Sequence, residues 1–290
     1  MRKNTIIKLL LILLSLLVST VAIEIGLNIF YSKQLNGNPN LEPYESTENI
    51  QHFRVVKSDI IYKPNPEIYS RIICLGDSFT YGHGVANDKT YPYILEKYLC
   101  NNLGKKVEVI NAGVCGSTIN EQLLMYNDSC SKLEHDIVLL LFSDSDIRDS
   151  AIIKLYNSKP IPRAAPALKI ISIIRRLRDT LRTNKTEKYL NNNEPLLIYE
   201  YIRYLKELNI QATKNNAKLI FATYDDTYNV LISRCKNYGI ECIDFRKEYL
   251  QYSKDNAIYL TVHHNELGNQ FLAEIIADKL IKNGTINKHK

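Results

Sequence analysis

The sequence of 290 residues contains no tryptophan, no C-x-x-C pair, no internal repeat and no low-complexity tract. Because no two cysteines have that spacing, the six cysteines fit no zinc-binding motif. Lys and Arg outnumber Asp and Glu only by 37 to 31, and they form no basic stripe interleaved with aromatic residues. We therefore expect neither a cysteine-based zinc site nor a nucleic-acid partner.

A long apolar stretch is present at the N-terminus. Basic residues precede an uncharged run over 9–23, and apolar residues resume after Glu24. Counted over 6–30, the stretch is long enough to cross a bilayer, and its basic flank favours a cytoplasmic N-terminus. We expect a cytoplasmic tip and a transmembrane anchor over 1–31, with the remaining chain on the outer side of the membrane.

A cleaved signal peptide is the competing interpretation of this stretch. Thr20-Val21-Ala22 offers a cleavage site of small residues. We favour an uncleaved signal-anchor, because the apolar character continues beyond that site. No cysteine lies nearby, which argues against a lipoprotein anchor.

Three regions follow the anchor. Residues 32–68 are rich in Asn, Pro, Glu, Ser and Tyr without a sustained period, which indicates a juxtamembrane connector. Residues 69–290 are long enough for one α/β domain. Within this domain, 150–193 form an inserted basic amphipathic segment. It is either a lid or a basic surface against anionic lipid, or, as we favour, a helix packed on the domain with its basic side in water.

Strands and helices alternate along the domain. Short apolar runs predict five strands, over 72–75, 107–110, 136–142, 218–224 and 240–244. Amphipathic periods predict helices over 90–103, 119–133, 194–214 and 230–238 and a closing helix around 271–280. This alternation predicts a three-layer α/β/α fold with a five-stranded parallel sheet, similar to flavodoxin.

The cysteines of an exported chain can form disulfides. Cys74 lies within the first buried strand and is expected to act as a small apolar residue. For the others, we consider Cys235 with Cys242, and Cys100 with Cys130, as the first pairings to test.

Ser78 is the candidate nucleophile. It follows the strand 72–75 and Gly76, so it lies at the carboxyl edge of the sheet, where open α/β folds place their ligands. A hydroxyl at that turn is both exposed and rigidly held, as a nucleophile must be. The alternative is an ordinary turn or helix cap, for which Asp and Ser are favoured residues.

Other polar residues follow the remaining strand ends. They are Asn111-Ala112-Gly113 after the second strand and Ser143-Asp144-Ser145-Asp146 after the third. His263 and His264 immediately precede the closing helix, and an imidazole is the group that a serine hydroxyl needs to lose its proton near neutral pH. A surface histidine without a catalytic role is the alternative.

Together these motifs resemble the SGNH, or GDSL-type, hydrolase family over residues 69–283. Block one is Gly76-Asp77-Ser78, block two is Asn111-Ala112-Gly113, and the last block, His263-His264-Asn265-Glu266-Leu267-Gly268, is similar to H-x-N-x-x-G. The resemblance implies Ser78 as nucleophile and His263 as general base, with His264 as the alternative register. It also implies an oxyanion hole of Ser78, Gly113 and Ser145, and neither a metal nor an organic cofactor.

Two positions depart from the family pattern. The third block of the family is G-x-N-D, and Ser145 takes the place of its Asn. The acid that orients the histidine is usually three residues before it, where this chain has Leu260. The site is then either a Ser-His dyad supported by a backbone carbonyl, or it takes its acid from Asp225, Asp226 or Asp255.

We therefore expect a membrane-anchored serine ester hydrolase on the outer side of the membrane. The resemblance suggests short acyl esters, such as acetyl groups of envelope or extracellular glycans, as substrates. A lipid esterase and a catalytically degenerate glycan-binding protein are the alternatives. Cys115 is a rival nucleophile in principle, but no base is found near it in the sequence, so a buried or bridged thiol is expected there.

Overall fold

The computed structural model describes residues 19, 67–156, 169–225, 228–259 and 262–286. The predicted anchor over 1–31 and connector over 32–68 fall almost entirely outside these ranges, as does part of the predicted insertion over 150–193. Within the described ranges, no helix is both long enough and apolar enough to cross a bilayer.

The chain divides into two compact units. The first consists of Met1–Pro39 and Ile161–Lys188, and the second of Asn40–Pro160 and Tyr189–Lys290. Helix α6 (Lys169–Lys214) begins in the first unit and ends in the second. The sheet and the helices that cover it belong to the second unit.

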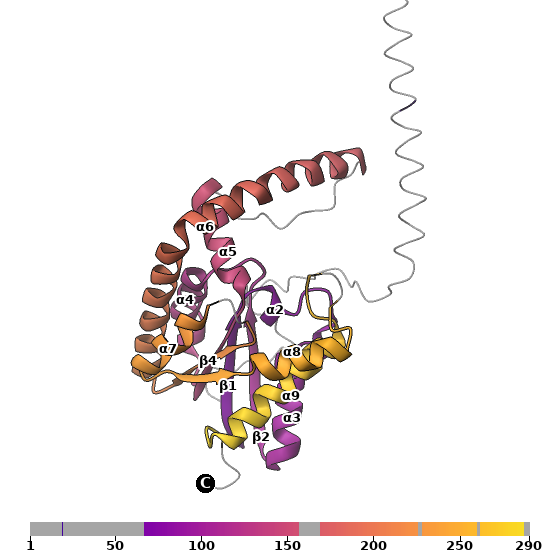
Figure 1. Ribbon diagram of the computed structural model, residues 1–290. Coiled ribbons are helices and arrows are strands. Elements are labelled where there is room, and N and C mark those ends of the chain that lie inside the picture. Colours follow the sequence, from indigo (N-terminus) through magenta and orange to yellow (C-terminus); the bar gives the residue numbers. More distant parts are fainter. Residues whose placement is uncertain (1–18, 20–66, 157–168, 226–227, 260–261, 287–290) are drawn as a thin grey trace, which may run out of the picture. The chain divides into compact units, whose positions relative to one another are not determined.

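Five parallel strands form the sheet, in the spatial order β2-β1-β3-β4-β5. They are β1 (Ile68–Gly76), β2 (Lys106–Gly113), β3 (Ile137–Phe142), β4 (Lys218–Thr223) and β5 (Glu241–Asp244). This arrangement, visible in Figure 1, confirms the predicted parallel sheet.

Both faces of the sheet are buried, as β3 shows. Val138, Leu140 and Phe142 join one core and Ile137, Leu139 and Leu141 join the other, with none of the six more than 3% exposed. Consecutive side chains of a strand point to opposite faces, so a strand that is apolar throughout needs a layer of helices on each side. The predicted three-layer architecture is therefore confirmed.

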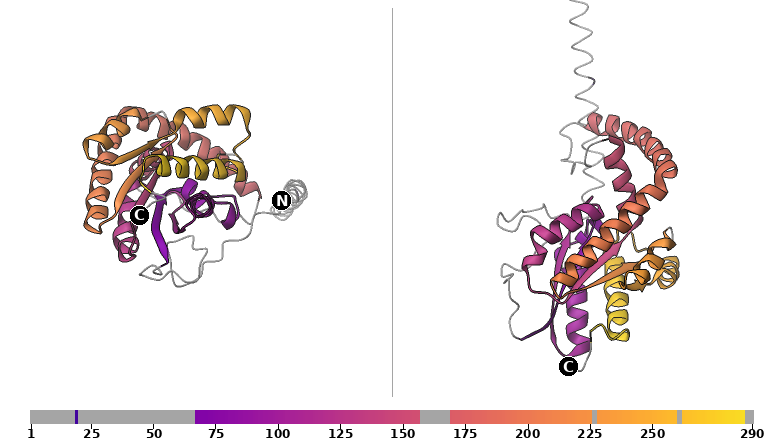
Figure 2. Two further views of the ribbon diagram at one scale, coloured as in Figure 1. Left: turned by 90° about the horizontal axis from the view of Figure 1, so that it is seen from below. Right: turned by 90° about the vertical axis from the view of Figure 1, so that its left-hand side faces the viewer.

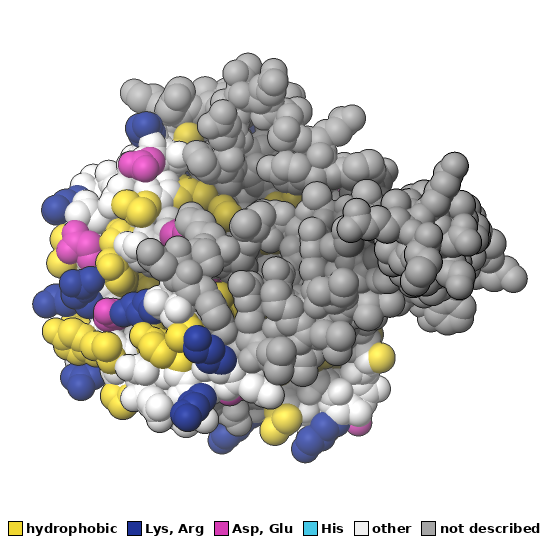
Figure 3. Space-filling model, turned by 90° about the horizontal axis from the view of Figure 1, so that it is seen from above, with side chains coloured by type: hydrophobic (Ala, Val, Ile, Leu, Met, Phe, Trp, Pro, Cys, Tyr) yellow, Lys and Arg dark blue, Asp and Glu magenta, His cyan; other side chains and the backbone are white. Residues whose placement is uncertain are grey.

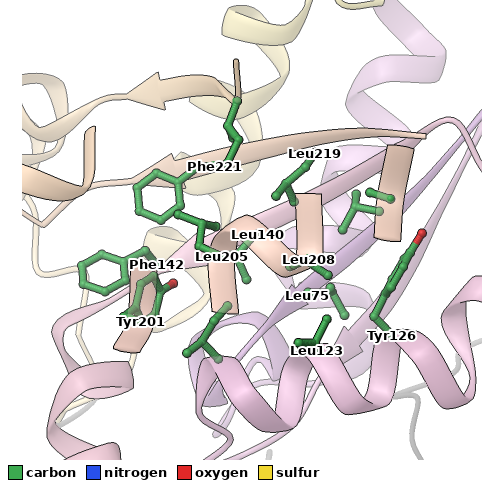
Figure 4. Close-up of a cluster of buried hydrophobic side chains, with 14 of the residues drawn as sticks. Leu75, Leu123, Tyr126, Leu140, Phe142, Tyr201, Leu205, Leu208, Leu219 and Phe221 are labelled. Atoms are coloured by element: carbon green, nitrogen blue, oxygen red, sulfur yellow. The ribbon is translucent and has the colours of Figure 1, made fainter. Parts of the chain in front are cut away.

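The first core lies between the sheet and a layer of helices (Figure 4). This layer contains α4 (Ile119–Asp128), α5 (Asp144–Tyr156), α7 (Asn229–Asn237) and the part of α6 that belongs to the second unit. Leu205 and Leu208 of α6, for example, belong to the same buried cluster as Phe221 of β4. The second core lies on the opposite face and is closed by α3 (Tyr91–Leu103), α8 (Arg246–Asp255) and α9 (Glu266–Lys282), as the views of Figures 1 and 2 show.

Several elements differ from the predicted ones. Helix α5 was not predicted, and α6 begins at Lys169 where a helix over 194–214 was predicted. Helix α8 has no counterpart among the predicted helices, because charged and polar residues outnumber apolar ones in it and only Tyr249 is buried. Strand β2 continues three residues beyond the predicted end at 110, since Asn111, Ala112 and Gly113 pair with Cys74, Leu75 and Gly76 of β1. The turn that follows β2 therefore comes later than predicted.

The cysteines are all free thiols. The proposed pairing of Cys100 with Cys130 is wrong, because Cys130 belongs to the first core and Cys100 packs against the second, on the opposite face of the sheet. Cys235 and Cys242 do lie within hydrogen-bond distance of each other, but as thiols. Cys74 is fully buried, as predicted.

Charged side chains of both signs lie on the described part of the face that Figure 3 shows. On the face shown in Figure 3, Lys and Arg side chains lie among hydrophobic and uncharged ones and do not form a continuous stripe. This distribution agrees with the modest formal charge of +6.

Candidate active site

Ser78 lies at the turn between β1 and the short helix α2 (Ser78–Tyr81). Asp77 caps this helix, because its Oδ1 accepts a hydrogen bond of 2.9 Å from the backbone N–H of Phe79. The cap fixes the backbone on both sides of Ser78, so the hydroxyl is half-buried and held at the carboxyl edge of the sheet.

His263 approaches this hydroxyl from the loop before α9. Its Nε2 lies 2.8 Å from Ser78 Oγ, although the two residues are 185 positions apart in the sequence. The loop is fixed at its end by Asn265, whose side chain caps α9 by accepting from the Gly268 N–H at 2.9 Å. The distance between hydroxyl and imidazole is that of a direct proton transfer.

His264 is buried away from Ser78. Only 2% of it is exposed, and its Nε2 lies 2.6 Å from the Tyr249 hydroxyl. Burial first, and then the neighbouring His263, lower the pKa of His264 to about 3. An imidazole with such a low pKa is a weak base near neutral pH, and it does not contact Ser78. The geometry thus favours the His263 register over the His264 alternative.

Two rings flank His263. The ring centroids of Phe79 and His83 lie 5.3 Å and 4.8 Å from its own. Burial, followed by the charge that His83 carries when protonated, lowers the pKa of His263 below its ordinary value. A lower pKa keeps the imidazole neutral, and so able to accept a proton, at pH values where a free histidine is partly charged.

No carboxylate of the described residues orients His263. Its hydrogen bond to Ser78 is the only one it makes there. Asp255 accepts a hydrogen bond of 3.2 Å from the Gln251 side chain of its own helix, α8. Asp225 accepts one of 3.1 Å from the Asp144 N–H, at the start of α5. Leu260 and Asp226 lie outside the described residues. Of the open alternatives, a dyad is the arrangement that the described part of the chain contains.

Two of the predicted oxyanion donors are engaged elsewhere. The Gly113 N–H donates to Asn111 Oδ1 at 3.0 Å, and the Ser145 hydroxyl donates to Asp77 Oδ2. Gly113 instead permits a close approach of chain segments, because a Cβ there would lie 2.2 Å from the Tyr81 backbone N. Only the N–H of Ser78, among the three predicted donors, makes no hydrogen bond within the described structure.

Gly116 is a candidate donor that the sequence reasoning missed. It occupies the turn Val114–Ser117, where its φ of 70° requires glycine and where its N–H makes no hydrogen bond to the described residues. The turn adjoins the nucleophile, because Ser117 Oγ donates to Gly76 O at 3.1 Å. A second glycine three residues after Gly113 was the available signal in the sequence.

Two buried carboxylates lie beneath the Ser78 turn. Asp77 accepts from Ser143 Oγ at 2.9 Å, and Asp146 accepts from the Ser143 N–H at 3.2 Å and from Gln122 at 2.9 Å. Burial raises the pKa of both, and for Asp146 the nearby Asp77 is the next cause. Burial and the neighbouring carboxyl both disfavour the charged form, so the pair holds a proton to higher pH than a free carboxyl does.

Cys115 lies at the exposed rim of the site. Its Sγ is 3.8 Å from Nδ1 of His83, so a histidine does lie near this thiol, contrary to expectation, and the thiol is neither buried nor bridged. Among the described residues, no group of His, Cys, Asp and Glu side chains could hold a metal ion.

A hydroxyl and an imidazole in contact at the carboxyl edge of a parallel α/β sheet are the arrangement expected of a serine hydrolase. The chain matches the model of the GDSL-like Lipase/Acylhydrolase family over residues 74–271. It belongs to this family and is a serine ester hydrolase.

The fold is shared with one solved structure at a TM-score above 0.5, and two further structures are similar at lower scores. LAE5, an alpha/beta hydrolase enzyme from the metagenome of Lake Arreo, Spain, is 15% identical, with 76% of this chain and 97% of that chain covered and a TM-score of 0.51. The acetyl xylan esterase AlAXEase is 17% identical over 73% of this chain and 100% of its own, with a TM-score of 0.48. The acetylxylan esterase Axe2 from Geobacillus stearothermophilus is 14% identical over 73% and 94%, with a TM-score of 0.49. Among curated proteins, none matches the chain.

Proposed function

We propose that the protein is a membrane-anchored esterase in which Ser78 is the nucleophile and His263 the general base. The observation that carries the proposal is the 2.8 Å contact between Ser78 Oγ and His263 Nε2. His263 takes the hydroxyl proton while Ser78 Oγ attacks the ester carbonyl carbon. The tetrahedral intermediate then collapses to an acyl-enzyme, and the same proton passes from His263 to the departing alcohol. Water repeats the sequence and releases the acid.

The oxyanion is stabilised by backbone donors. The N–H groups of Ser78 and Gly116 have no other hydrogen-bond partner among the described residues, and both lie beside the nucleophile turn. A side-chain donor from Ser145 would first have to leave Asp77. Each donor of this kind contributes on the order of 100- to 1,000-fold to turnover, so a hole built from two backbone groups still supports catalysis.

The proposed substrates are short acyl esters, such as acetyl groups carried by envelope or extracellular glycans. The exposed rim around the half-buried Ser78, which includes His83 and Cys115, suits an acyl group presented on a large molecule. The predicted anchor over 1–31, with the N-terminus in the cytoplasm, would hold the domain over 69–290 outside the membrane, near such glycans.

The test is hydrolysis by the purified full chain in detergent micelles. We expect release of acetate from acetylated oligosaccharides and from p-nitrophenyl acetate, with loss of turnover in Ser78→Ala and His263→Ala. An unchanged rate in Ser78→Ala would overturn the assignment of the nucleophile.

Two alternative functions have specific support. Two exposed apolar side chains within four residues of the base in the sequence, Val262 at 68% and Leu267 at 38%, favour a lipid esterase, which would release fatty acid in preference to acetate. The lack of a carboxylate partner for His263 in the described residues favours a binding protein without turnover. In that case the chain would bind acetylated glycan but release no acid from any ester.

A further inference from the structure

The His263 imidazole is held without the usual carboxylate. The acid of a serine hydrolase triad mainly fixes the orientation and tautomer of the imidazole. Within the described residues, Ser78 is the only hydrogen-bond partner of His263, so another attachment must restrain it. The next residue, His264, has the contacts to supply this restraint.

His264 is enclosed by aromatic rings. The centroids of Phe79 and Tyr259 lie 5.0 Å from its own, and those of Tyr224 and Tyr249 lie at 5.4 and 5.6 Å. Its Nε2 lies 2.6 Å from the Tyr249 hydroxyl, which also hydrogen-bonds to the Tyr259 hydroxyl. Packing and hydrogen bonding together hold the His264 ring in a single orientation.

The enclosed ring also closes the loop that carries His263. Tyr259 and His264 form an antiparallel backbone bridge, and the N–H of Asn265 donates to Ile258 O at 2.9 Å. The first turn of α9 packs tightly against the same place, because a Cβ on Gly268 would lie 3.0 Å from the Cβ of His264. The backbone on the C-terminal side of His263 is therefore fixed.

Phe79 connects this enclosure to the nucleophile. Its ring lies 5.0 Å from His264 and 5.3 Å from His263, and it is the next residue after Ser78. A movement of the His264 ring would displace the Phe79 ring. That displacement would in turn shift Ser78 and His263 relative to each other. A misplacement of about 1 Å in such a contact costs about 100-fold in rate.

We propose that His264, Tyr249 and Tyr259 form a positioning network that holds His263 against Ser78 in the role otherwise filled by a carboxylate. The inference rests on the proposed function of Ser78 and His263. These three residues touch no reacting atom, and they act on the reaction only through His263.

Tyr249→Phe tests the network with the smallest change, because it removes one hydroxyl and keeps the ring. Tyr252→Phe is the matched control on the same helix, since that ring stacks on Phe271 at 4.2 Å and its hydroxyl makes no hydrogen bond to the described residues. We expect kcat for p-nitrophenyl acetate to fall about tenfold in Tyr249→Phe with KM unchanged, as for the loss of one net hydrogen bond. Tyr252→Phe should keep the wild-type kcat.

A double-mutant cycle separates positioning from a merely structural role. In a His263→Ala background, Tyr249→Phe should have no further effect on the residual rate, because the residue it positions is gone. The same tenfold loss in both backgrounds, or a wild-type kcat in Tyr249→Phe, would overturn the network.

Variants of His264 provide a second test of the network. His264→Gln retains a polar side chain that can hydrogen-bond to the Tyr249 hydroxyl and should keep most of kcat, whereas His264→Leu should lose about tenfold or more at a temperature where both variants are folded. Equal kcat in the two variants would contradict the inference.

If the wild-type chain and Ser78→Ala hydrolyse the ester equally, the proposed function fails and the network fails with it. An active, Ser78-dependent chain with an unaffected Tyr249→Phe variant refutes the network alone.

Discussion

In the part of the chain that the structure describes, buried charged groups have ion-pair partners at the amino edge of the sheet but not at its carboxyl edge. At the amino edge, Arg71 Nε lies 2.5 Å from Glu108 Oε2, and Asp136 accepts from the Arg71 N–H at 2.8 Å. At the carboxyl edge, Asp77 and Asp146 are buried with no ion-pair partner among the described residues. A charged partner compensates the buried charge at one edge, whereas at the other edge burial raises the pKa of both carboxyls.

This difference separates stability from function. A buried ion pair with further hydrogen bonds is a structural solution, and breaking it destabilises the fold. A buried carboxyl pair without a cation opposes folding, and it lies beneath the one turn that carries the nucleophile. Local features that oppose stability tend to persist where a site needs them.

Arg71→Met should have the largest effect, because it leaves Glu108 buried and unpaired. We expect the free energy of unfolding to fall by ~3–5 kcal/mol, measured by urea denaturation, with kcat of the folded fraction unchanged. The double variant Arg71→Met/Glu108→Leu should recover most of the loss. A double variant as unstable as the single one would show that the ion pair is not the cause.

Asp146→Asn should raise the free energy of unfolding, because it removes one of two buried carboxyls that oppose folding. Because the pKa values of the pair are raised in the folded chain, it holds its proton to higher pH than the unfolded chain, which loses it near pH ~4, so wild-type stability falls as pH rises. The asparagine variant cannot titrate there, and its advantage in Tm should grow from pH 5 to pH 8. Gln122 Oε1, which has no partner, can accept from the new amide once the Gln122 amide turns over.

Asp128→Asn is the control for that experiment, because Asp128 is exposed and should show no advantage that depends on pH. A constant or shrinking advantage of Asp146→Asn over the same range would argue against a proton retained at the carboxyl edge.

Ser145→Ala should reduce kcat less than tenfold, because the Ser145 hydroxyl donates to Asp77 and not toward the nucleophile. Steady-state hydrolysis of p-nitrophenyl acetate measures it. A loss on the order of 100- to 1,000-fold would instead make Ser145 a donor of the oxyanion hole.

His83→Gln should have the smallest effect, a shift of the acid limb of the pH profile of kcat/KM. A protonated His83 disfavours the charged form of His263 and lowers its pKa, so removing His83 raises that pKa and moves the limb to higher pH. Added salt should move the wild-type limb in the same direction and leave the variant almost unaffected. A shift to lower pH would contradict the arrangement of the two rings.

Much of this fold follows from sequence pattern alone. The continuous apolar run of β3 can be buried only between two layers, and the helices predicted over 90–103 and 230–238 agree with α3 and α7 within one residue at each end. The positions of Ser78 and His263 at one edge follow from the parallel order of the strands. Each of these features depends on periodicity, which is local in the sequence.

Features that depend on tertiary contacts were not predictable in the same way. The pairing of Gly113 with Gly76 extends β2, the Gly113 N–H donates to Asn111 Oδ1, and no periodicity signals either feature. The orientation of the Ser145 hydroxyl depends on Asp77, 68 residues away. Helix α8 buries only Tyr249, so its apolar period is too weak to predict it.

The contact between Ser78 and His263 is the central claim, and labelling with a fluorophosphonate probe tests it most directly. The purified full chain is treated in parallel with Ser78→Ala, His263→Ala and His264→Gln, and the modified peptide is identified by mass spectrometry. We predict adducts on Ser78 in the wild-type chain and in His264→Gln, and none in Ser78→Ala or His263→Ala. Labelling of His263→Ala at the wild-type rate, or an adduct on another residue, would contradict the account.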